Sequence, residues 1–530
     1  MSETTPASST ATTRRGFVKA TVGGAAALAA LSGLRVANAA ESSAAADAAT
    51  SSKINDIFSG RANARQIADD LWWVGGSDKR IALFENAYPL EQGVAYNSYL
   101  LLDEQVALID TVDRSITGQF FENLQAVLDG RTVDYLIVNH MEPDHSFAIS
   151  QVLSRFPQAK VVCTAAAATL IQQFFGLDVS DRLVTAAEGD TLSIGKHTLA
   201  FVEAPMVHWP EVMMTFDATN GVLFSADAFG TFNALDGNIF ADQVNFTEDD
   251  KWLAEARRYY CNIVGKYGQN VQDVLAKAAT LDISMLCATH GPIWRQDLGW
   301  ILDKYDKWSS YTPEDQAVAI FYGSIYGGTE NAANILASKL SDAGVSNVKV
   351  YDVSKTHDSW LIAEAFRCSH LVFASATYNM GIFTNMKNFL NDLVAHNMQN
   401  RHVSFIENGS WSPASGQLMK DIVAQMPNMT EVGTMVTLHS TTSAENVGEL
   451  DAMAQAIAAS LSGDDSGAAA ASGAGDAGKV SDSEAEEIKA ELRQWKCKVC
   501  GYVYEGTEMP ADFKCPVCGV GSDQFEEITA

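Results

Sequence analysis

The chain has 530 residues, of which 47% are hydrophobic and 19% are charged. Its length predicts about three domains, and its apolar content excludes a wholly disordered or collagen-like protein. The net charge is −29, from 36 basic and 65 acidic residues. Such a surface repels nucleic acid and anionic lipid, so we expect neither as a partner. Runs of about eighteen strongly apolar residues are absent from the sequence, which predicts no integral membrane span.

The first forty residues have the pattern of an export signal. The segment Arg14-Arg15-Gly16-Phe17-Val18-Lys19 precedes an Ala/Gly-rich stretch over 20–34, and a small-x-small cleavage pattern follows at Ala37-Asn38-Ala39. Residues 1–39 therefore resemble a twin-arginine signal peptide. An uncleaved anchor and an Ala-rich tail with an accidental arginine pair are the alternatives. The resemblance implies export by the twin-arginine route and an extracytoplasmic protein, in the periplasm or cell envelope, that begins near Ala40.

Residues 54–311 have the pattern of a mixed α/β domain. Two apolar runs predict strands, and two stretches with helical periodicity lie among them. The segment Thr312-Pro313-Glu314-Asp315 predicts the end of this domain. We expect strands over 100–110 and 133–140, and helices over 123–129 and 150–156.

Metal-ligating residue types concentrate in this first domain. The cluster His140-Met141-Glu142-Pro143-Asp144-His145 comes directly after an expected strand, and His208, Asp227 and His290 follow at other expected strand ends or loops. A single histidine is more often a surface or hydrogen-bonding residue. Four imidazoles and three carboxylates together suffice for two metal ions, with one carboxylate left to bridge them.

The HxxxDH pattern of the cluster resembles the metallo-β-lactamase fold, whose hydrolases carry His where this chain has Glu142. The H-x-E-x-D-H version, with His208-Trp209-Pro210 and Asp227-Ala228-Phe229-Gly230, resembles flavodiiron proteins. An added carboxylate suits a redox-active iron pair better than a third imidazole does. The resemblance implies a metallo-β-lactamase-like αββα domain. It also implies one iron bound by His140, Glu142 and His208, another by Asp144, His145 and His290, and Asp227 as the bridge.

Residues 315–461 predict a second α/β domain. An apolar strand over 317–322 leads through a Gly-rich turn into a helix over 329–342. Alternation of strands and helices predicts a flavodoxin-like, doubly wound parallel sheet. Further strands are expected over 349–353, 371–374 and 403–406.

The Gly-rich turn, Gly323–Glu330, has hydroxyls, glycines and helix amides that suit a phosphate. It lacks the lysine of a P-loop. The turn resembles the flavodoxin phosphate loop, and Ser375–Phe383 and Asn408–Ser412 occupy the places of flavodoxin ring-binding loops. The resemblance implies FMN, bound by Ser324, Ile325, Tyr326, Gly327, Gly328, Thr329, Ala376, Thr377, Tyr378, Asn379, Gly381, Gly409, Ser410 and Trp411.

Residues 462–493 are rich in Gly, Ala, Ser and Asp in the manner of a flexible linker, and residues 494–530 form a last module. Cys497, Cys500, Cys515 and Cys518 predict a tetrahedral site of four thiolates, for which iron and zinc both remain open. The module resembles rubredoxin. Fourteen residues separate Cys500 from Cys515, which is closer to the rubredoxin-like tail of rubrerythrins. Its small core is expected from Trp495, Tyr502, Tyr504 and Phe513.

Taken over the whole chain, the resemblance implies a flavodiiron oxidoreductase with a diiron site, FMN and a mononuclear Fe(Cys)4 centre. Electrons would pass from the rubredoxin centre to FMN and then to the iron pair, which would reduce O₂ to water or NO to N₂O. An unidentified redox donor and a head-to-tail homodimer or tetramer are implied as well. The alternatives are a zinc hydrolase with a flavodoxin passenger and a non-catalytic electron-transfer or redox-sensing protein.

Overall fold

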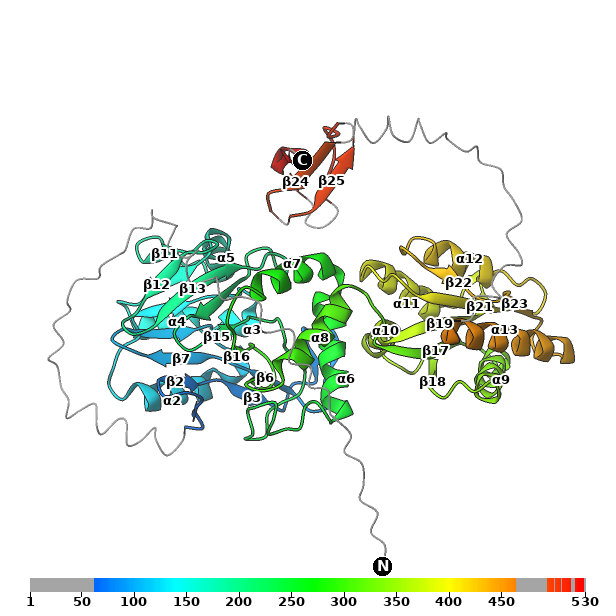
Figure 1. Cartoon of the computed structure of the whole chain (residues 1–530), viewed down its shortest axis with the longest axis horizontal. Coiled ribbons are helices and arrows are strands. Elements are labelled where there is room, and N and C mark those ends of the chain that lie inside the picture. Colours follow the sequence, from blue (N-terminus) through cyan, green and yellow to red (C-terminus); the bar gives the residue numbers. More distant parts are fainter. Residues whose placement is uncertain (1–61, 464–492, 500, 507, 516–519, 529–530) are drawn as a thin grey trace, which may run out of the picture. The chain divides into compact units, whose positions relative to one another are not determined.

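The computed structural model describes residues 62–463, 493–499, 501–506, 508–515 and 520–528 (Figure 1). The expected export signal lies outside the described residues, as does nearly all of the expected linker. Within the described ranges, every helix is too short or too polar to cross a bilayer.

The first domain is built on two β-sheets. The first sheet has the order β1-β2-β7-β8-β9-β10-β11, and the second has the order β12-β13-β14-β15-β16. The strands of the first sheet are Arg65–Gln66, Leu71–Trp73, Tyr99–Leu102, Val106–Ile109, Tyr135–Ile137, Lys160–Cys163 and Leu183–Thr185. Those of the second are Thr191–Ser193, Thr198–Glu203, Met213–Asp217, Val222–Phe224 and Met285–Cys287.

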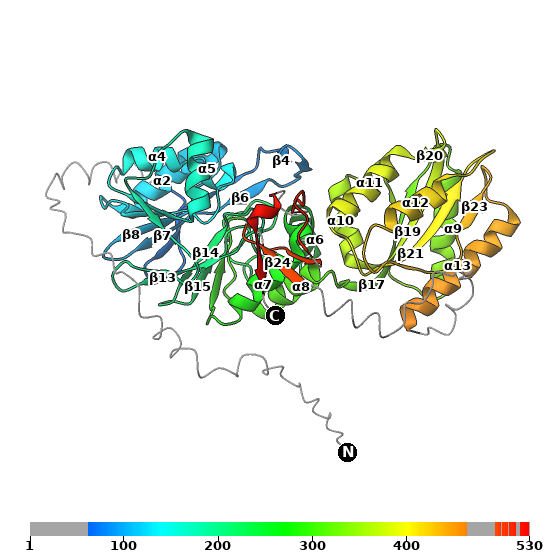
Figure 2. The same cartoon turned by 90° about the horizontal axis from the view of Figure 1, so that it is seen from above.

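Alternation of side chains along these strands explains the layers. Leu101 and Ile109 of the first sheet belong to the same buried cluster as Phe201 and Phe224 of the second, so these faces pack on each other. The opposite faces pack against helices, which completes the expected αββα arrangement. Figure 2 shows α2, α4 and α5 together beside β7 and β8. The helices are Thr117–Leu128 (α2), Pro143–Ser146 (α3), Ile149–Arg155 (α4), Ala165–Phe175 (α5), Asp250–Tyr259 (α6), Gly268–Ala278 (α7) and Leu298–Ser309 (α8).

Two short hairpins lie beside these sheets. Strands β3 (Gly76–Asp78) and β6 (Val94–Tyr96) pair antiparallel, as do β4 (Leu83–Phe84) and β5 (Tyr88–Pro89). The segment from β4 to β5 becomes part of the wall of the metal site.

The prediction of a single strand over 100–110 is wrong. The chain instead forms the antiparallel pair β7 and β8, in which Leu100 lies opposite Leu108. The acidic pair Asp103-Glu104 stands at the turn, where polar side chains remain in water. The strand expected over 133–140 is shorter than predicted, because β9 ends at Ile137 and leaves His140 in the following loop.

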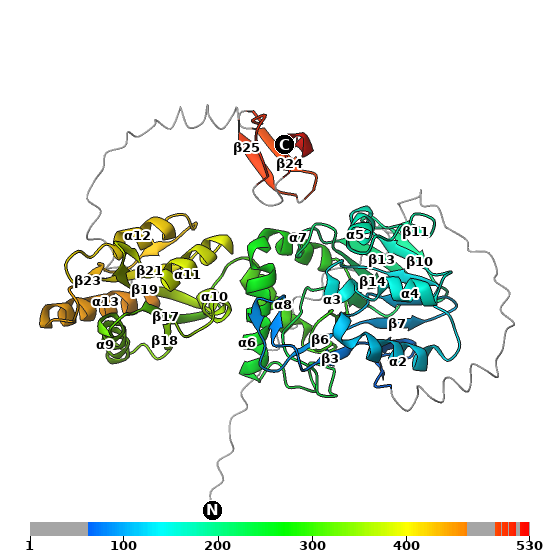
Figure 3. The same ribbon diagram turned by 180° about the vertical axis from the view of Figure 1, so that it is seen from behind.

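The second domain confirms the expected doubly wound parallel sheet. Its order is β18-β17-β19-β21-β22, with parallel pairing throughout, and β23 also pairs with β21. Helices α9 and α13 pack together on one face, and α10, α11 and α12 cover the other (Figure 3). The strands are Asp315–Gly323 (β17), Val348–Asp352 (β18), Cys368–Tyr378 (β19), Gly381–Ile382 (β20), His402–Asn408 (β21), Thr430–Glu431 (β22) and Val436–Leu438 (β23). The helices are Gly328–Asp342 (α9), Asp358–Arg367 (α10), Thr384–Ala395 (α11), Ser415–Val423 (α12) and Ala444–Ser462 (α13).

The C-terminal module contains a three-stranded antiparallel sheet. Its order is β25-β24-β26, with strands Val503–Gly506, Arg493–Cys497 and Phe525–Ile528. The expected aromatic core is confirmed: the ring centroids of Trp495 and Tyr504 lie 5.8 Å apart, and those of Tyr504 and Phe513 lie 4.6 Å apart.

Candidate metal centre and cofactor loops

The seven ligand candidates come from loops that follow or join strands of the first domain. The segment 140–145 follows β9, and His208 lies between β13 and β14. Asp227 follows β15, and His290 follows β16. Strands β15 and β16 pair in parallel, so their carboxyl ends bring Asp227 and His290 to the same edge of the sheet.

The structure brings all seven residues together, in two groups. Within each group one potential ligand atom per residue lies within 4.8 Å of the others. Neither group contains a cysteine, and each mixes imidazole with carboxylate, the donor set of non-haem iron. The first group is His140, Glu142, His208 and Asp227, and the second is Asp144, His145 and His290.

Asp227 joins the two groups through its two carboxylate oxygens. Its Oδ2 lies 3.1 Å from Nε2 of His208 and 3.5 Å from Nε2 of His140. Its Oδ1 lies 2.9 Å from Nε2 of His145 and 3.8 Å from Nε2 of His290. One oxygen therefore faces each group, which is the geometry that a bridging carboxylate requires.

Each group holds a further carboxylate among its imidazoles. Glu142 Oε2 lies 3.3 Å from Nε2 of His140 and 3.1 Å from Nε2 of His208. Asp144 Oδ2 lies 3.2 Å from Nε2 of His290 and 3.3 Å from Nε2 of His145.

The donor atoms of this site fit bound metal ions. Both carboxylate oxygens of Asp144 and the Nε2 of His290 are buried and form no hydrogen bond of acceptable geometry among the described residues, although Asp144 Oδ2 and His290 Nε2 lie close together. Buried polar atoms normally have partners, so atoms of this kind that converge on one point indicate ligands. The residues therefore fit two metal ions, one in each group.

The charges of the site reinforce one another. Burial alone would lower the pKa of His145 and of His208, but the neighbouring carboxylates outweigh burial and raise both to about 9. Burial would raise the pKa of Asp227, yet the surrounding imidazoles hold it well below its ordinary value. The Asp227 carboxylate is thus ionised, the state that binds a cation.

Hydrogen bonds behind the ligands fix their orientation. His290 Nδ1 donates to the carbonyl of Ala95 at 2.8 Å, and the Thr289 hydroxyl donates to Asp227 Oδ1. His140 Nδ1 lies 2.9 Å from Oε1 of Glu211. Such outer partners orient metal-binding imidazoles and are part of a metal site.

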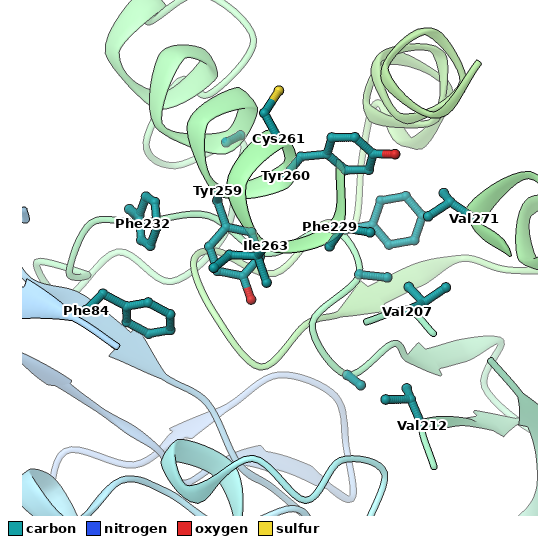
Figure 4. Close-up of a cluster of buried hydrophobic side chains, with 14 of the residues drawn as sticks. Phe84, Val207, Val212, Phe229, Phe232, Tyr259, Tyr260, Cys261, Ile263 and Val271 are labelled. Carbon is teal, nitrogen blue, oxygen red and sulfur yellow. The ribbon is translucent and has the colours of Figure 1, made fainter. Parts of the chain in front are cut away.

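Aromatic side chains wall the second group. The rings of Phe84 and Tyr259 each lie 5.4 Å from the ring of His290, and that of Tyr96 lies 5.6 Å away. Figure 4 shows Phe84 and Tyr259 in one buried cluster with Phe232. On the other side, the Trp209 ring stands edge-on to His140 at 5.2 Å. These walls exclude water from the ligands.

Two acidic residues near the site were not predicted from the sequence. Glu211 is fully buried behind His140. Glu85 follows β4 at the rim, where partial removal from water and the charge of Glu142 raise its pKa to about 8. Glu211 lies in the same segment as the His208-Trp209-Pro210 motif, and this proximity is the one sequence signal from which it could have been predicted.

The three predicted flavin loops lie at the carboxyl edge of the second sheet. Gly323 at the end of β17 lies opposite Ser375 in β19, and Ala376 lies opposite Asn408 at the end of β21. Parallel doubly wound sheets bind ligands at this edge. The three segments also carry the exposed aromatic residues of this domain: Tyr326, Tyr378 and Trp411.

The phosphate-loop candidate has a tight, glycine-dependent shape. Gly327 has φ of +90°, and its N–H donates to the Ser324 hydroxyl at 3.1 Å. A Cβ at Gly328 would lie 2.0 Å from the carbonyl oxygen of Ser440, so only glycine fits there. Helix α9 begins at Gly328 and directs its free amides toward this turn.

The second flavin segment differs in part from the expectation of a loop. Ala376, Thr377 and Tyr378 belong to β19, and the turn itself is Asn379-Met380, with φ of +50° and +57°. The Thr377 hydroxyl accepts hydrogen bonds from the N–H groups of Ala414 and Ser415, at the start of α12. Thr377 therefore joins the second segment to the third.

Two of the four predicted cysteine ligands, Cys497 and Cys515, lie in the described part of the last module, and both are buried. Cys500 and Cys518 lie outside the described residues. The N–H of Gly501 donates to the carbonyl of Cys497 at 2.9 Å, with Gly501 at φ of +77°. The chain thus turns sharply just after the first cysteine.

Comparisons with protein families agree with the three domains. Residues 94–291 match the ODP family beta lactamase, residues 320–495 match flavodoxin, and residues 495–526 match the rubrerythrin rubredoxin-like domain. The last match agrees with the short spacing between the two cysteine pairs.

Individual relatives extend over more than one domain. An anaerobic nitric oxide reductase flavorubredoxin from Pectobacterium carotovorum is 32% identical over 352 residues, which cover 65% of this chain and 69% of the relative. One from Pectobacterium atrosepticum is 28% identical over 511 residues, covering 87% of this chain and 99% of the relative. The solved structure of rubredoxin oxygen:oxidoreductase from the anaerobe Desulfovibrio gigas matches with a TM-score of 0.71 at 27% identity, covering 76% of this chain and 99% of that structure's chain. The chain belongs to the flavodiiron proteins and has flavorubredoxin homologues, and it combines a metallo-β-lactamase-like domain, a flavodoxin domain and a rubredoxin-like domain.

Proposed function

We propose that this oxidoreductase reduces NO to N₂O, O₂ to water, or both, at an iron pair in the first domain. The observation that carries the proposal is Asp227, whose two oxygens face two separate ligand groups. Two metal ions held by one carboxylate are positioned to act on one small molecule together. The names of the relatives support NO as a substrate, and the Desulfovibrio gigas structure supports O₂.

The residues of the site supply what this chemistry needs. The carboxylates of Glu142, Asp144 and Asp227 stabilise the oxidised state of iron because they are hard, anionic ligands. When bound, the iron pair supplies electrons and a place for the gas. The aromatic wall around His290 keeps bulk water away, which strengthens the electrostatic interactions inside the site.

We further infer that electrons enter at the cysteine-bound iron of the last module and reach the first domain through FMN. Exposed aromatic residues at the edge of the second sheet, Tyr326 at 99% and Trp411 at 88% exposure, support a flat ring bound there.

We also infer a head-to-tail homodimer or tetramer, which sedimentation of the holoprotein tests. An active monomer would contradict it.

Metal and flavin content of the purified protein is the first test. We expect about three irons per chain, a pair in the first domain and one in the last, together with one FMN. The reduced protein should then consume NO or O₂. Two zinc ions in place of the iron pair would favour a hydrolase of the same fold, and a full iron pair without gas turnover would favour a non-catalytic redox protein.

Asp227→Ala should remove both irons of the pair and leave FMN in place, because the substitution touches only the first domain. The matched control is Asp242→Ala, in the same domain, whose carboxylate forms a partly exposed ion pair with Arg295 at 2.8 Å. Iron and flavin analysis of both variants checks the prediction. Full gas consumption by the Asp227→Ala variant would show that Asp227 is not the bridge.

Residues 1–39 lead us to propose that the protein is exported by the twin-arginine route and acts outside the cytoplasm. The support is the paired arginines and the Ala37-Asn38-Ala39 pattern. N-terminal sequencing of protein from the cell envelope should start near Ala40. A first residue of Met1 in that fraction would contradict cleavage.

A further inference from the structure

We propose that Glu211 is a positioning residue that makes the two halves of the metal centre chemically unequal. The inference rests on the iron pair of the proposed function and adds a role for a residue that is not a ligand. Glu211 Oε1 lies 2.9 Å from Nδ1 of His140, and it also accepts the N–H of Met141 at 3.0 Å. The side chains of Glu211 and His140 are both fully buried.

The two histidines of the second group have no such partner. His290 donates its Nδ1–H to the backbone carbonyl of Ala95, a neutral acceptor. His145 Nδ1 has no hydrogen-bond partner within the described ranges. Among the described residues, Asp110 is a buried carboxylate that interacts electrostatically with His145, but its oxygens accept hydrogen bonds from Asn139 instead. The carboxylate that hydrogen-bonds the outer nitrogen of a ligand therefore lies behind His140, in the first group.

An anionic acceptor changes the imidazole that it holds. A carboxylate behind a metal-binding histidine fixes its tautomer and ring orientation, and it raises the basicity of the nitrogen that faces the metal. His140 presents Nε2 to Glu142 and Asp227, so the added electron density points into the first group. The iron in this group should then hold its ferric state more strongly than the other iron does.

The chain fixes Glu211 in this place through its backbone. The Glu211 carbonyl accepts a hydrogen bond from the Thr164 hydroxyl at 3.0 Å, and that hydroxyl also caps α5 by accepting from the N–H of Ala167 at 3.1 Å. Glu211 comes three residues after His208 in the chain. One loop thus supplies a ligand of the first group and the outer partner of another ligand.

The two oxygens of Glu211 have different surroundings. Its Oε2 is buried without a hydrogen-bond partner among the described residues. Oε1 alone therefore makes the contacts to His140 and Met141. Glutamine in its place keeps an acceptor for His140 and Met141 while removing the charge.

Glu211→Gln tests the inference in the holoprotein. We expect near-normal iron content but a changed iron spectrum: the two Mössbauer doublets of the pair should become more alike, and the reduction potential of one iron should rise. Glu211→Ala should weaken iron binding by about 10–100-fold, as loss of an outer partner does. The control is Glu188→Gln, which removes a charge from a partly exposed pair with Lys277 at 2.7 Å.

Unchanged doublets and an unchanged potential in an iron-replete Glu211→Gln variant would overturn the inference. If the purified variant contains too little iron for spectroscopy, its metal-free form is titrated with Fe(II), and an affinity equal to that of the Glu188→Gln control would overturn the inference. Failure of the proposed function is seen separately, as zinc or no metal in the unaltered protein. In a zinc-loaded protein, Glu211→Ala should still lower metal affinity relative to the control.

Discussion

At the scale of single residues, His197 is buried between two carboxylates far along the chain from it. Its Nδ1 lies 2.9 Å from Asp217 Oδ2, and its Nε2 lies 3.0 Å from Asp70 Oδ2. Burial alone would lower the pKa of His197, but the two carboxylates raise it above the ordinary value of 6.5. Because the folded-state pKa is the higher one, the stabilisation is complete below pH 6.5 and is lost as the pH rises through the folded-state pKa.

His197→Gln should lower the free energy of unfolding by about 3 kcal/mol at pH 6, because the buried Asp217 loses its cationic partner. The difference from the unaltered protein should be smaller at pH 9 than at pH 6, because a larger fraction of the folded-state histidine is neutral at the higher pH. Urea unfolding at the two pH values measures it. The control is His396→Gln, whose ring Nδ1 lies 2.7 Å from the carbonyl oxygen of Asp392 in the preceding helix. An equal loss at both pH values would contradict the charge argument.

The ligands and their outer partners differ in how far the sequence predicts them. His140, Glu142, Asp144 and His145 stand within six residues, so their spacing alone indicates a site. Glu211, by contrast, lies 71 positions after His140 in the chain, so no short motif links the two residues. Its role depends on how the loop between β13 and β14 folds over β9, and single-residue patterns do not encode that.

At the scale of helices and strands, burial on both faces explains which elements were predicted well. The strand over 317–322 is a continuous apolar run because β17 lies inside a parallel sheet covered by helices on both faces. Its neighbours β19 and β21 were found for the same reason. Strand β18 lies at the edge of the sheet and is only partly buried. The hairpin of β7 and β8 was missed because both strands are also buried on two faces, and the polar turn between them is only three residues long.

Some contacts between elements leave no pattern in the sequence at all. The guanidinium of Arg401 is fully buried and donates to the carbonyls of Ala365 and Phe366, in the last turn of α10, and to the carbonyl of Tyr311. Burial lowers the pKa of Arg401 to about 10. A positive charge at this end of α10 complements the helix dipole. In the sequence, Arg401 looks like any surface arginine between a helix and a strand.

At the scale of the whole molecule, the three domains place three different donor sets on one chain. Carboxylates and imidazoles suit an iron pair, the edge of a doubly wound sheet suits a flavin, and paired cysteines suit a single iron. Each set was predicted from local motifs, because each is built mainly from short segments at strand ends. The order in which electrons pass between the three centres is a property of the assembled protein, so it has to be measured.

Cys515→Ser separates the possible orders of electron transfer. The variant should lose the cysteine-bound iron and its visible absorption, because Cys515 is one of the four predicted ligands and is buried in the module. The iron pair and FMN lie in other domains and should remain. Iron content should therefore fall by about one per chain, with flavin content unchanged. Cys163→Ala, which removes a buried free thiol from the first domain, is the control.

Two kinds of reductant then show where electrons enter. If they enter at the last module, a protein electron donor should no longer support gas reduction by the Cys515→Ser variant. Direct photoreduction of the flavin should still support it at the rate of the unaltered protein, because FMN and the iron pair are intact. The Cys163→Ala control should respond to both reductants. Turnover of the Cys515→Ser variant with the protein donor at full rate would mean that electrons reach FMN directly, and the module would need another role.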